Sequence, residues 1–498
     1  GRKSARRESV SPRSVPHHPA GEAPRWSDHA FWILCAGGGS VVLLALTNTI
    51  CQDVAVIPFL WILPLSLYLL TFIICFGHPD WYRRAWLGPV AALLGLLLMA
   101  RWRGWFLPSL SWEIALHAAT VLVGCLITHG ELVQTRPTAT HLTGFYLAVA
   151  LGGALGGVFV ALVAPVLFEG YWETELGLTG VGLVFAAGLW RDQQRQPGAA
   201  QKAGFLAATA FTLVFAGLAA WHIRSGLRDV IDQRRNFYGV QKVRLYAGKD
   251  PANRQHLFYS GSTIHGMQFM EGERRAWPTL YFGTTTGIGR LFQSALDDDG
   301  PPRRLGLVGL GVGVLSAYAR PGDHFRYYEI NPAVEALARE HFHFLADCPG
   351  TVEVVTGDAR LSLEREPDAQ FDVLVLDAFT GGAIPMHLLT REAFELYRRQ
   401  VRQDGVIACH ITNENLDLLP VLARHAQELG WQLVAFENPN DLARAVVRAR
   451  WAILTANTSV ARRLREARPP DAEPEPTTGP LWTDQRHDLF SVLRRTTD

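Results

Sequence analysis

Three glycines at alternate positions form the most distinctive motif of the sequence. Gly309, Gly311 and Gly313 follow an apolar run at 304–309 that we expect to be a β-strand. Glycine lets the backbone turn tightly at a strand end and approach a ligand closely. The pattern that binds NAD needs a further glycine at position 314, where this chain has Val314. The spacing therefore favours a ligand of the adenosylmethionine type over NAD.

Three acidic residues end the next three predicted strands. Glu329 lies about 20 residues after the glycines, where a carboxylate can accept hydrogen bonds from both ribose hydroxyls. Asp358 is placed to accept a bond from an adenine amino group, and Asp377 faces the predicted site of group transfer. Each acid alone is also compatible with a helix cap or a turn. Motifs at four successive strand ends favour a ligand site.

The elements that must position these residues alternate regularly. We expect strands at 304–309, 324–330, 351–356, 371–376, 405–411, 431–437 and 449–455. We expect helices directly after the glycine-rich turn and at 332–345, 386–401 and 416–429. This order predicts an α/β, Rossmann-like domain with a parallel sheet and helices on both faces. A small β-rich region at 236–292 precedes it, with stretches at 240–246, 256–260 and 262–267.

The N-terminal half reads as an α-helical multi-span membrane domain, because a span needs about 20 apolar residues. Candidate spans are 29–51, 53–76, 86–101, 110–128, 142–168, 176–190 and 204–223. A soluble bundle would need polar helix faces, which these runs lack, and Trp and Tyr gather at their ends. The Gly152-Gly153 and Gly156-Gly157 pairs predict a close helix contact.

Charges beside these runs bear on topology. The segment 1–28 is rich in Arg, Ser and Pro and predicts a basic, disordered linker, not a signal peptide. The positive-inside rule places it in the cytoplasm, and Arg224 and Arg228 place the C-terminal domain there too, at a bacterial-type inner membrane. Both signals agree only for an even number of spans, so one of the seven candidates is split, missed or re-entrant. Because the chain begins at Gly1, we also expect sequence before it.

Five polar residues lie in or beside the candidate spans, and charges at membrane depth often mark function. They are Asp53, Glu113, His129, Glu131 and Arg136. Because most lie near predicted span ends, we expect interfacial placement.

Composition excludes some functions and bounds the domains. A net charge of +1 gives no sign of a nucleic-acid partner. The six cysteines and the scattered histidines show no ligand spacing, so we expect free thiols and no metal. The expected divisions are a linker at 1–28, a membrane domain at 29–223, a connector and β-rich region at 224–292, the Rossmann-like domain at 293–457 and a tail at 458–498.

The motifs together resemble the spermidine synthase-like (polyamine aminopropyltransferase-like) proteins that are fused to a multi-span membrane region. In the C-terminal half the resemblance rests on residues 236–240, Gly261, 265–268, 278–281, the glycine loop, 328–330, 357–360, 377–379 and 482–484. In the N-terminal half it rests on 53–55, Pro58, 60–61, 129–132, 136–137 and 142–143.

The resemblance implies a Rossmann-like, class I adenosylmethionine-binding fold with a β-rich lid. It implies transfer of an aminopropyl group from decarboxylated adenosylmethionine to an amine, and it assigns roles to individual residues. The donor, either adenosylmethionine or its decarboxylated form, would contact Gly309, Gly311, Gly313, Glu329, Asp358, Ala359 and Gln268. The catalytic candidates are Asp377, Tyr281 and His265, with Tyr281 and the Gln268 region beside the acceptor.

The chain departs from the spermidine synthase pattern where acids are needed. An ammonium acceptor must lose a proton before it attacks, so the reaction needs a base. The sequence has Thr380 and Gly382 where related chains carry acids after Asp377, and Val312 inside the glycine loop. Three functions stay open: an aminopropyltransferase, an adenosylmethionine-dependent methyltransferase, and a membrane transporter or sensor that binds a nucleoside. The candidate partners are an amine or lipid-like acceptor, the lipid bilayer and a second copy of the chain.

Overall fold

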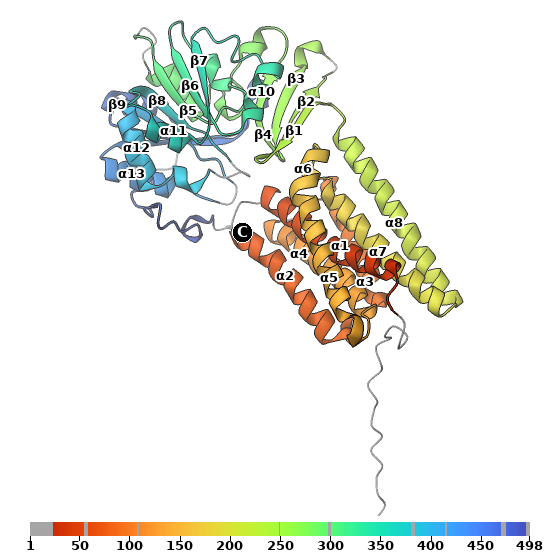
Figure 1. Cartoon of the computed structure of the whole chain (residues 1–498). Helices are drawn as coiled ribbons and strands as arrows, with labels where there is room; N and C mark the ends of the chain where they lie inside the picture. Colours follow the sequence, from red (N-terminus) through yellow and green to blue (C-terminus); the bar gives the residue numbers. More distant parts are fainter. Residues whose placement is uncertain are drawn as a thin grey trace, which may run out of the picture. The chain divides into compact units, whose positions relative to one another are not determined.

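The computed structural model divides the chain into two compact units, Gly1–Arg228 and Asp229–Asp498 (Figure 1). It describes residues 23–53, 58–106, 109–248, 250–296, 300–379, 384–413, 416–469 and 475–494. The division falls after Arg228, close to the domain boundary that the sequence predicts after residue 223.

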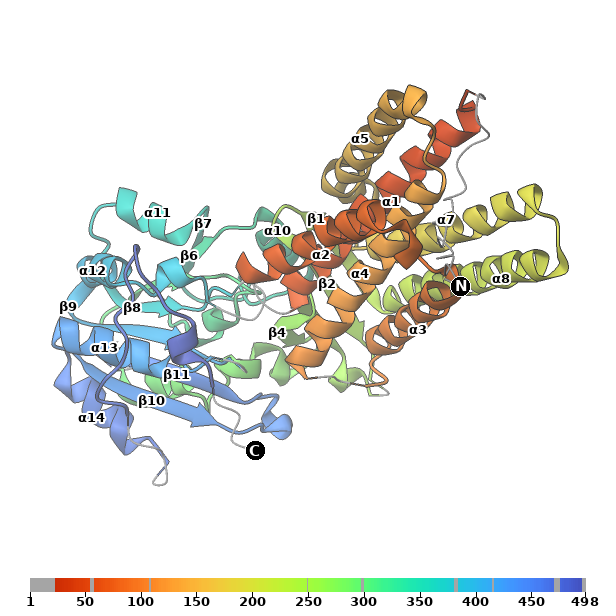
Figure 2. The same cartoon turned by 90° about the horizontal axis from the view of Figure 1, so that it is seen from below.

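The first unit is helical. Its helices are α1 (Trp26–Asp53), α2 (Pro58–Gly77), α3 (Arg84–Trp102), α4 (Leu110–Gln134), α5 (Leu142–Val158), α6 (Ala164–Leu167), α7 (Glu173–Arg195) and α8 (Ala199–Gly226), with a π-helical turn, Phe159–Val163, between α5 and α6. In the described part of the chain, six helical segments are long and apolar enough to cross a membrane. The sequence predicts seven; the difference is α7, which forms a helix beside α8 (Figure 2) but lacks the apolar length.

The predicted close contact of the glycine pairs is confirmed. On α5, a Cβ at Gly152 would overlap with the backbone of Ile33 on α1, and a Cβ at Gly156 would overlap with the backbone of Gly37. Helix backbones come this close only where small residues line the contact.

His129 and Glu131 lie inside the helical unit, because α4 continues to Gln134 and not to residue 128. Both side chains are fully buried. Glu131 accepts hydrogen bonds from Tyr82 and from both nitrogens of a bidentate Arg84, each at 2.6 Å. A buried carboxylate needs such partners, because an unpaired charge at this depth is costly.

The second unit begins with a four-stranded antiparallel sheet in the order β1-β2-β3-β4. Its strands are β1 (Val230–Asn236), β2 (Gly239–Tyr246), β3 (Gln255–Ser260) and β4 (Thr263–Phe269). Three of them were expected from alternating apolar residues. β1 was missed because its sequence, VIDQRRN, is polar throughout its second half and carries no alternation.

A seven-stranded sheet in the order β10-β11-β9-β8-β5-β6-β7 forms the rest of the unit (Figure 1). The strands are β5 (Arg304–Val308), β6 (His324–Glu329), β7 (Thr351–Thr356), β8 (Phe371–Leu376), β9 (Val401–His410), β10 (Gln432–Asn438) and β11 (Ala449–Thr455). The expectation of a parallel sheet fails at β11, which is antiparallel to both neighbours. No crossover helix separates β10 from β11, and only such a crossover would make consecutive strands parallel. This order and this single reversal define a Rossmann-like methyltransferase-type fold.

Helices cover both faces of this sheet. The helices are α9 (Gly287–Arg290), α10 (Pro332–His341), α11 (Ala359–Arg365), α12 (Arg391–Gln400), α13 (Leu419–Leu429) and α14 (Thr458–Glu466). On one face, Leu305 and Leu307 of β5 pack with α9, α10 and α14. On the other face, Leu374 and Leu376 of β8 pack with α11, α12 and α13. Each pair lies on one face because alternate residues of a strand point the same way. The predicted cover on both faces is confirmed.

The glycine loop leads into a turn and not into the helix that we expected. Only a 3-10 turn, Val314–Tyr318, follows Gly313. Ala319 then adopts an extended conformation, two residues before Pro321. Pro321 also disfavours a helical conformation of Arg320, the residue before it, which opposes a helix beyond this turn.

Candidate functional site

The glycine loop lies against Asp377, which follows β8, and against His265 on β4. Gly309 has a φ of 97° and Gly313 has a φ of 78°, which side chains other than glycine rarely tolerate. A Cβ at Gly309 would overlap with the carbonyl oxygen of Asp377. A Cβ at Gly311 would lie 3.0 Å from the carbonyl oxygen of His265 on β4. The loop backbone therefore packs against neighbouring backbone so closely that a side chain at Gly309 would clash.

Glu329 holds this loop in place. Its Oε2 accepts a hydrogen bond from the backbone N–H of Leu310 at 3.0 Å, and its Oε1 accepts one from Asn331 at 2.9 Å. The side chain is buried, and burial raises its pKa, against the opposing effect of the backbone hydrogen bonds. Each carboxylate oxygen has a second lone pair, so both can also accept a ribose hydroxyl.

Asp358 caps α11 and faces a histidine. Its Oδ1 accepts the backbone N–H of Leu361 at 2.8 Å, which is the capping contact that its position also allowed. Its Oδ2 lies 3.3 Å from Nε2 of His387. Ala359 is buried at the first position of α11. Oδ1 of Asp358 is therefore used in the helix cap, and Oδ2 faces His387.

Asp377 pairs with His410, a residue that the motif search missed. The Oδ1 of Asp377 lies 2.6 Å from Nδ1 of His410, and Nε2 of His410 lies 2.7 Å from Oγ1 of Thr412. His410 is buried, and the side chain of Asp377 is 11% exposed. Burial raises the pKa of Asp377, and His410 opposes that shift. A signal for His410 was available, because it ends the strand next to the one that Asp377 follows, and ligands collect at such strand ends.

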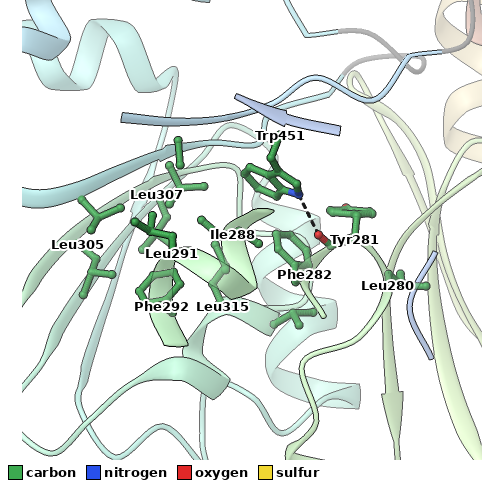
Figure 3. Close-up of a cluster of buried hydrophobic side chains, with 14 of the residues drawn as sticks. Leu280, Tyr281, Phe282, Ile288, Leu291, Phe292, Leu305, Leu307, Leu315 and Trp451 are labelled. Atoms are coloured by element: carbon green, nitrogen blue, oxygen red, sulfur yellow. Dashed lines mark hydrogen bonds between the residues drawn. The ribbon is translucent and has the colours of Figure 1, made fainter. Parts of the chain in front are cut away.

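Aromatic rings enclose His410. Its imidazole stacks on Tyr281 with ring centres 4.3 Å apart and on Trp451 at 4.8 Å, and Phe379 meets it edge-on at 4.8 Å. Figure 3 shows Trp451 and Tyr281 side by side, with the indole Nε1 of Trp451 donating to the Tyr281 carbonyl at 3.0 Å. Burial and the charge of Asp377 raise the pKa of Tyr281 well above its usual value. The phenol is therefore a hydrogen-bond donor at neutral pH.

β4 brings His265 to the same place. The Tyr281 hydroxyl donates to the His265 carbonyl oxygen at 3.4 Å. Burial, reinforced by His410, lowers the pKa of His265 to about 4, so its ring is neutral at pH 7. The three residues predicted as catalytic, Asp377, Tyr281 and His265, thus gather around His410.

The remaining predicted positions have other surroundings. The amide of Gln268 is used within the unit, since Nε2 donates to the Arg275 carbonyl at 3.0 Å and Oε1 accepts from the His343 backbone at 2.8 Å. Val312 is buried, and a Cβ at Gly266 on β4 would meet its side chain. Thr380 and Gly382 lie outside the described residues.

One cluster of potential metal ligands occurs in the described residues, away from the glycine loop. Ligand atoms of Asp232, Glu340 and His341 lie within 4.8 Å of one another. The guanidinium of Arg234 hydrogen-bonds to both carboxylates. Arg234 thus joins the two carboxylates in an ion-pair network between β1 and α10.

Comparisons with known proteins point to transferases. No protein-family model matches the sequence. A polyamine aminopropyltransferase of Vibrio vulnificus is 36% identical over 190 residues, which cover 37% of this chain and 60% of the relative. An N-terminal histidine N-methyltransferase of Emericella nidulans is 33% identical over 113 residues, which cover 22% of this chain and 20% of the relative. The chain thus matches less than two thirds of the length of either relative.

Solved structures resemble the chain more weakly. A probable spermidine synthase from Corynebacterium glutamicum has a TM-score of 0.36 at 19% identity, over 47% of this chain and 86% of that chain. A putative O-methyltransferase from Klebsiella pneumoniae has a TM-score of 0.25 at 15% identity, over 34% of this chain and 77% of that chain. The sequence match to the aminopropyltransferase and the strand order together support spermidine synthase-like homology.

Proposed function

We propose that the chain is a membrane-anchored alkyltransferase that binds decarboxylated adenosylmethionine or adenosylmethionine and transfers an aminopropyl group to an amine. The observation that carries the proposal is the gathering of four strand-end motifs at one edge of the sheet. There Asp377 contacts His410, His410 stacks on Tyr281, and Tyr281 hydrogen-bonds to the backbone of His265. The identity to a polyamine aminopropyltransferase supports the choice of group.

The residues fit the nucleoside part of such a donor. Glu329 would accept the ribose hydroxyls, and Asp358 with Ala359 would contact the adenine. The positive φ angles of Gly309, Gly311 and Gly313 support a tight turn at this strand end, of the kind that brings a backbone close to a ligand. When bound, the donor supplies a carbon activated by a sulfonium sulfur.

The catalytic side of the site suits a nucleophile that must lose a proton. Asp377 is the one acid at the carboxyl end of β8 in the described residues, and its Oδ2 has no hydrogen bond to any of them. His265 takes a proton poorly at neutral pH, because burial lowers its pKa to about 4. Asp377 would therefore receive the proton of the acceptor.

A methyltransferase is the second candidate, and one observation favours it. The fungal relative is a named N-methyltransferase, and its match is 33% identical over 113 residues. Val312 also stands where spermidine synthases carry an acid in the glycine loop. Both candidates alkylate a nucleophile with the same class of donor, so the site residues keep their roles in either one.

The helical unit would serve as the anchor in the bilayer. Six apolar helical segments of sufficient length support this role, with the transferase unit on the cytoplasmic side. A cavity of about 580 Å³ lined by α3, α4, α7 and α8 is almost wholly apolar, which supports a lipid-like acceptor as an alternative to a small soluble amine. The four-stranded sheet would act as a lid, because β4 lies against the glycine loop.

A donor titration tests the proposal. The full chain in detergent is titrated by calorimetry with adenosylmethionine, with its decarboxylated form and with methylthioadenosine. Tighter binding of the decarboxylated donor supports aminopropyl transfer, and tighter binding of the carboxylated donor replaces it with methyl transfer. If none of the three binds, the transferase proposal is refuted.

A further inference from the structure

Asp377, His410 and Trp451 form one row across three neighbouring strands. β8 and β9 pair in parallel with Leu376 opposite Cys409, so the next residues along the two strands are Asp377 and His410. β11 runs antiparallel to β9, with Trp451 directly opposite His410. Paired residues of a sheet project to the same face. The sheet register itself therefore sets the imidazole between the carboxylate and the indole.

The hydrogen bonds around His410 fix which nitrogen carries a proton. Oγ1 of Thr412 accepts the backbone N–H of Arg450 at 2.8 Å, which leaves the hydroxyl hydrogen free to point to Nε2 of His410. Nδ1 then carries the proton and donates to Oδ1 of Asp377. If the imidazole is doubly protonated, Nδ1 still donates to Asp377. In both states the imidazole occupies Oδ1 and leaves Oδ2 open.

We propose that His410 is a positioning residue that keeps Asp377 ionised and directs its Oδ2 to the acceptor, and that this pair replaces the acids absent at Val312 and Thr380. The inference rests on the proposed function, and it deepens it by naming the residue that positions the proton acceptor. The aromatic faces of Tyr281 and Trp451 support the pair, because the stacked rings hold the imidazole in one plane.

The transfer step balances with this pair. An ammonium acceptor gives one proton to Oδ2 of Asp377, which leaves a neutral amine and a neutral carboxylic acid. The amine nitrogen forms a bond to the carbon next to the sulfonium sulfur, and the carbon–sulfur bond breaks with its electron pair going to sulfur. The products are a more substituted ammonium and a neutral thioether. Asp377 returns its proton to water, and His410 keeps its own proton throughout.

Two substitutions of similar size separate positioning from packing. In His410→Asn, the amide nitrogen reaches the place of Nδ1 and can still donate to Asp377. In His410→Gln, it reaches the place of Nε2 and keeps only the Thr412 contact. We expect His410→Gln to lower kcat by about tenfold to a hundredfold, as loss of a hydrogen bond to a buried charge does. We expect His410→Asn to retain most of the rate, with donor affinity unchanged in both. His425→Gln, which keeps its bond to the Leu389 carbonyl, is the control for a buried histidine elsewhere.

The pH dependence of stability gives a readout that needs no activity. The titratable groups that face the pair are Tyr281 and His265. Because burial raises the pKa of Asp377, the folded chain binds its proton more tightly than the unfolded chain. The ionised carboxylate of Asp377 therefore lowers the free energy of unfolding. This destabilisation is fully present above the pKa of the folded chain and disappears below the pKa of the unfolded chain, about 3.9. Loss of His410 increases that destabilisation, so the difference in Tm between wild type and His410→Gln should shrink as the pH falls from 8 to 5.

The experiment measures kcat and KM with 1,4-diaminobutane and the donor that binds in the titration, and Tm of the donor-free full chain between pH 5 and 8. A rate loss confined to His410→Gln, with a Tm difference that shrinks in acid, supports the inference. Equal rates in both variants and wild type, or equal losses with a Tm difference that ignores pH, overturn it. If no donor binds to the wild type, the proposed function fails, and the Tm arm still tests whether His410 stabilises ionised Asp377.

Discussion

Replacing Glu329 by alanine tests the nucleoside site and the stability of the loop together. The carboxylate is the acceptor for two buried backbone N–H groups, those of Leu310 and Asn331. A buried donor left without a partner costs about 1–3 kcal/mol, so Glu329→Ala should lower the free energy of unfolding by about 2–6 kcal/mol. Such a loss is large against the 5–15 kcal/mol, roughly, by which domains are stable.

Glu329→Gln is the informative companion. One oxygen remains to accept a backbone N–H, so we expect a loss of about 1–3 kcal/mol, while the missing charge still weakens ribose binding by about tenfold or more. Unfolding is followed by temperature in detergent, and affinity by calorimetry with methylthioadenosine. Glu395→Gln, an exposed acid on α12, is the control for charge. The reasoning is refuted if Glu329→Ala unfolds and binds methylthioadenosine as the wild type does.

Three further predictions follow from particular contacts. Gly309→Ala should abolish methylthioadenosine binding and lower the free energy of unfolding by more than the roughly 1–2 kcal/mol that a left-handed alanine costs. Gly430→Ala, at a φ of 67° with open space around it, should lower it only by that amount and bind normally. Equal unfolding temperatures of the two variants would contradict this. Because burial raises the pKa of Glu329, affinity for methylthioadenosine should fall as the pH is lowered through that raised value; calorimetry between pH 5 and 8 checks it, and constant affinity would speak against a carboxylate in the site. Arg84→Met leaves a buried carboxylate unpaired and should cost about 3–5 kcal/mol, unlike Arg195→Met at an exposed position; thermal unfolding in detergent decides, and equal stabilities would show that the ion pair contributes little.

The sequence predicted those parts of the fold that follow from local patterns. The seven strands of the large sheet were expected within a few residues, because each is a short apolar run bounded by turn residues. The prediction that β11 is parallel to its neighbours was wrong, because the direction of a strand depends on the connection that precedes it, here the one after β10, and not on its own residues. The length of α4 was underestimated because His129 and Glu131 interrupt its apolar run, although Thr71 and Arg84, from other helices, hydrogen-bond to them in the fold.

The candidate site divides in the same way. Gly309, Glu329 and Asp358 could be predicted because each belongs to a motif within one strand-loop unit. The pairing of Asp377 with His410 could not be read from a motif, because the partners are 33 residues apart and meet only through the register of β8 and β9. The stacking of Trp451 on His410 likewise depends on the antiparallel pairing of β11 with β9.

The central claim is that one edge of the seven-stranded sheet binds the nucleoside of an alkyl donor. A structure of the full chain with methylthioadenosine measures this directly. We predict ribose hydroxyls within hydrogen-bond distance of the Glu329 carboxylate, adenine beside Asp358 and Ala359, and the sulfur on the side of Asp377 and His410. A ligand seated elsewhere, for example in the apolar cavity between α3, α4, α7 and α8, would contradict the account.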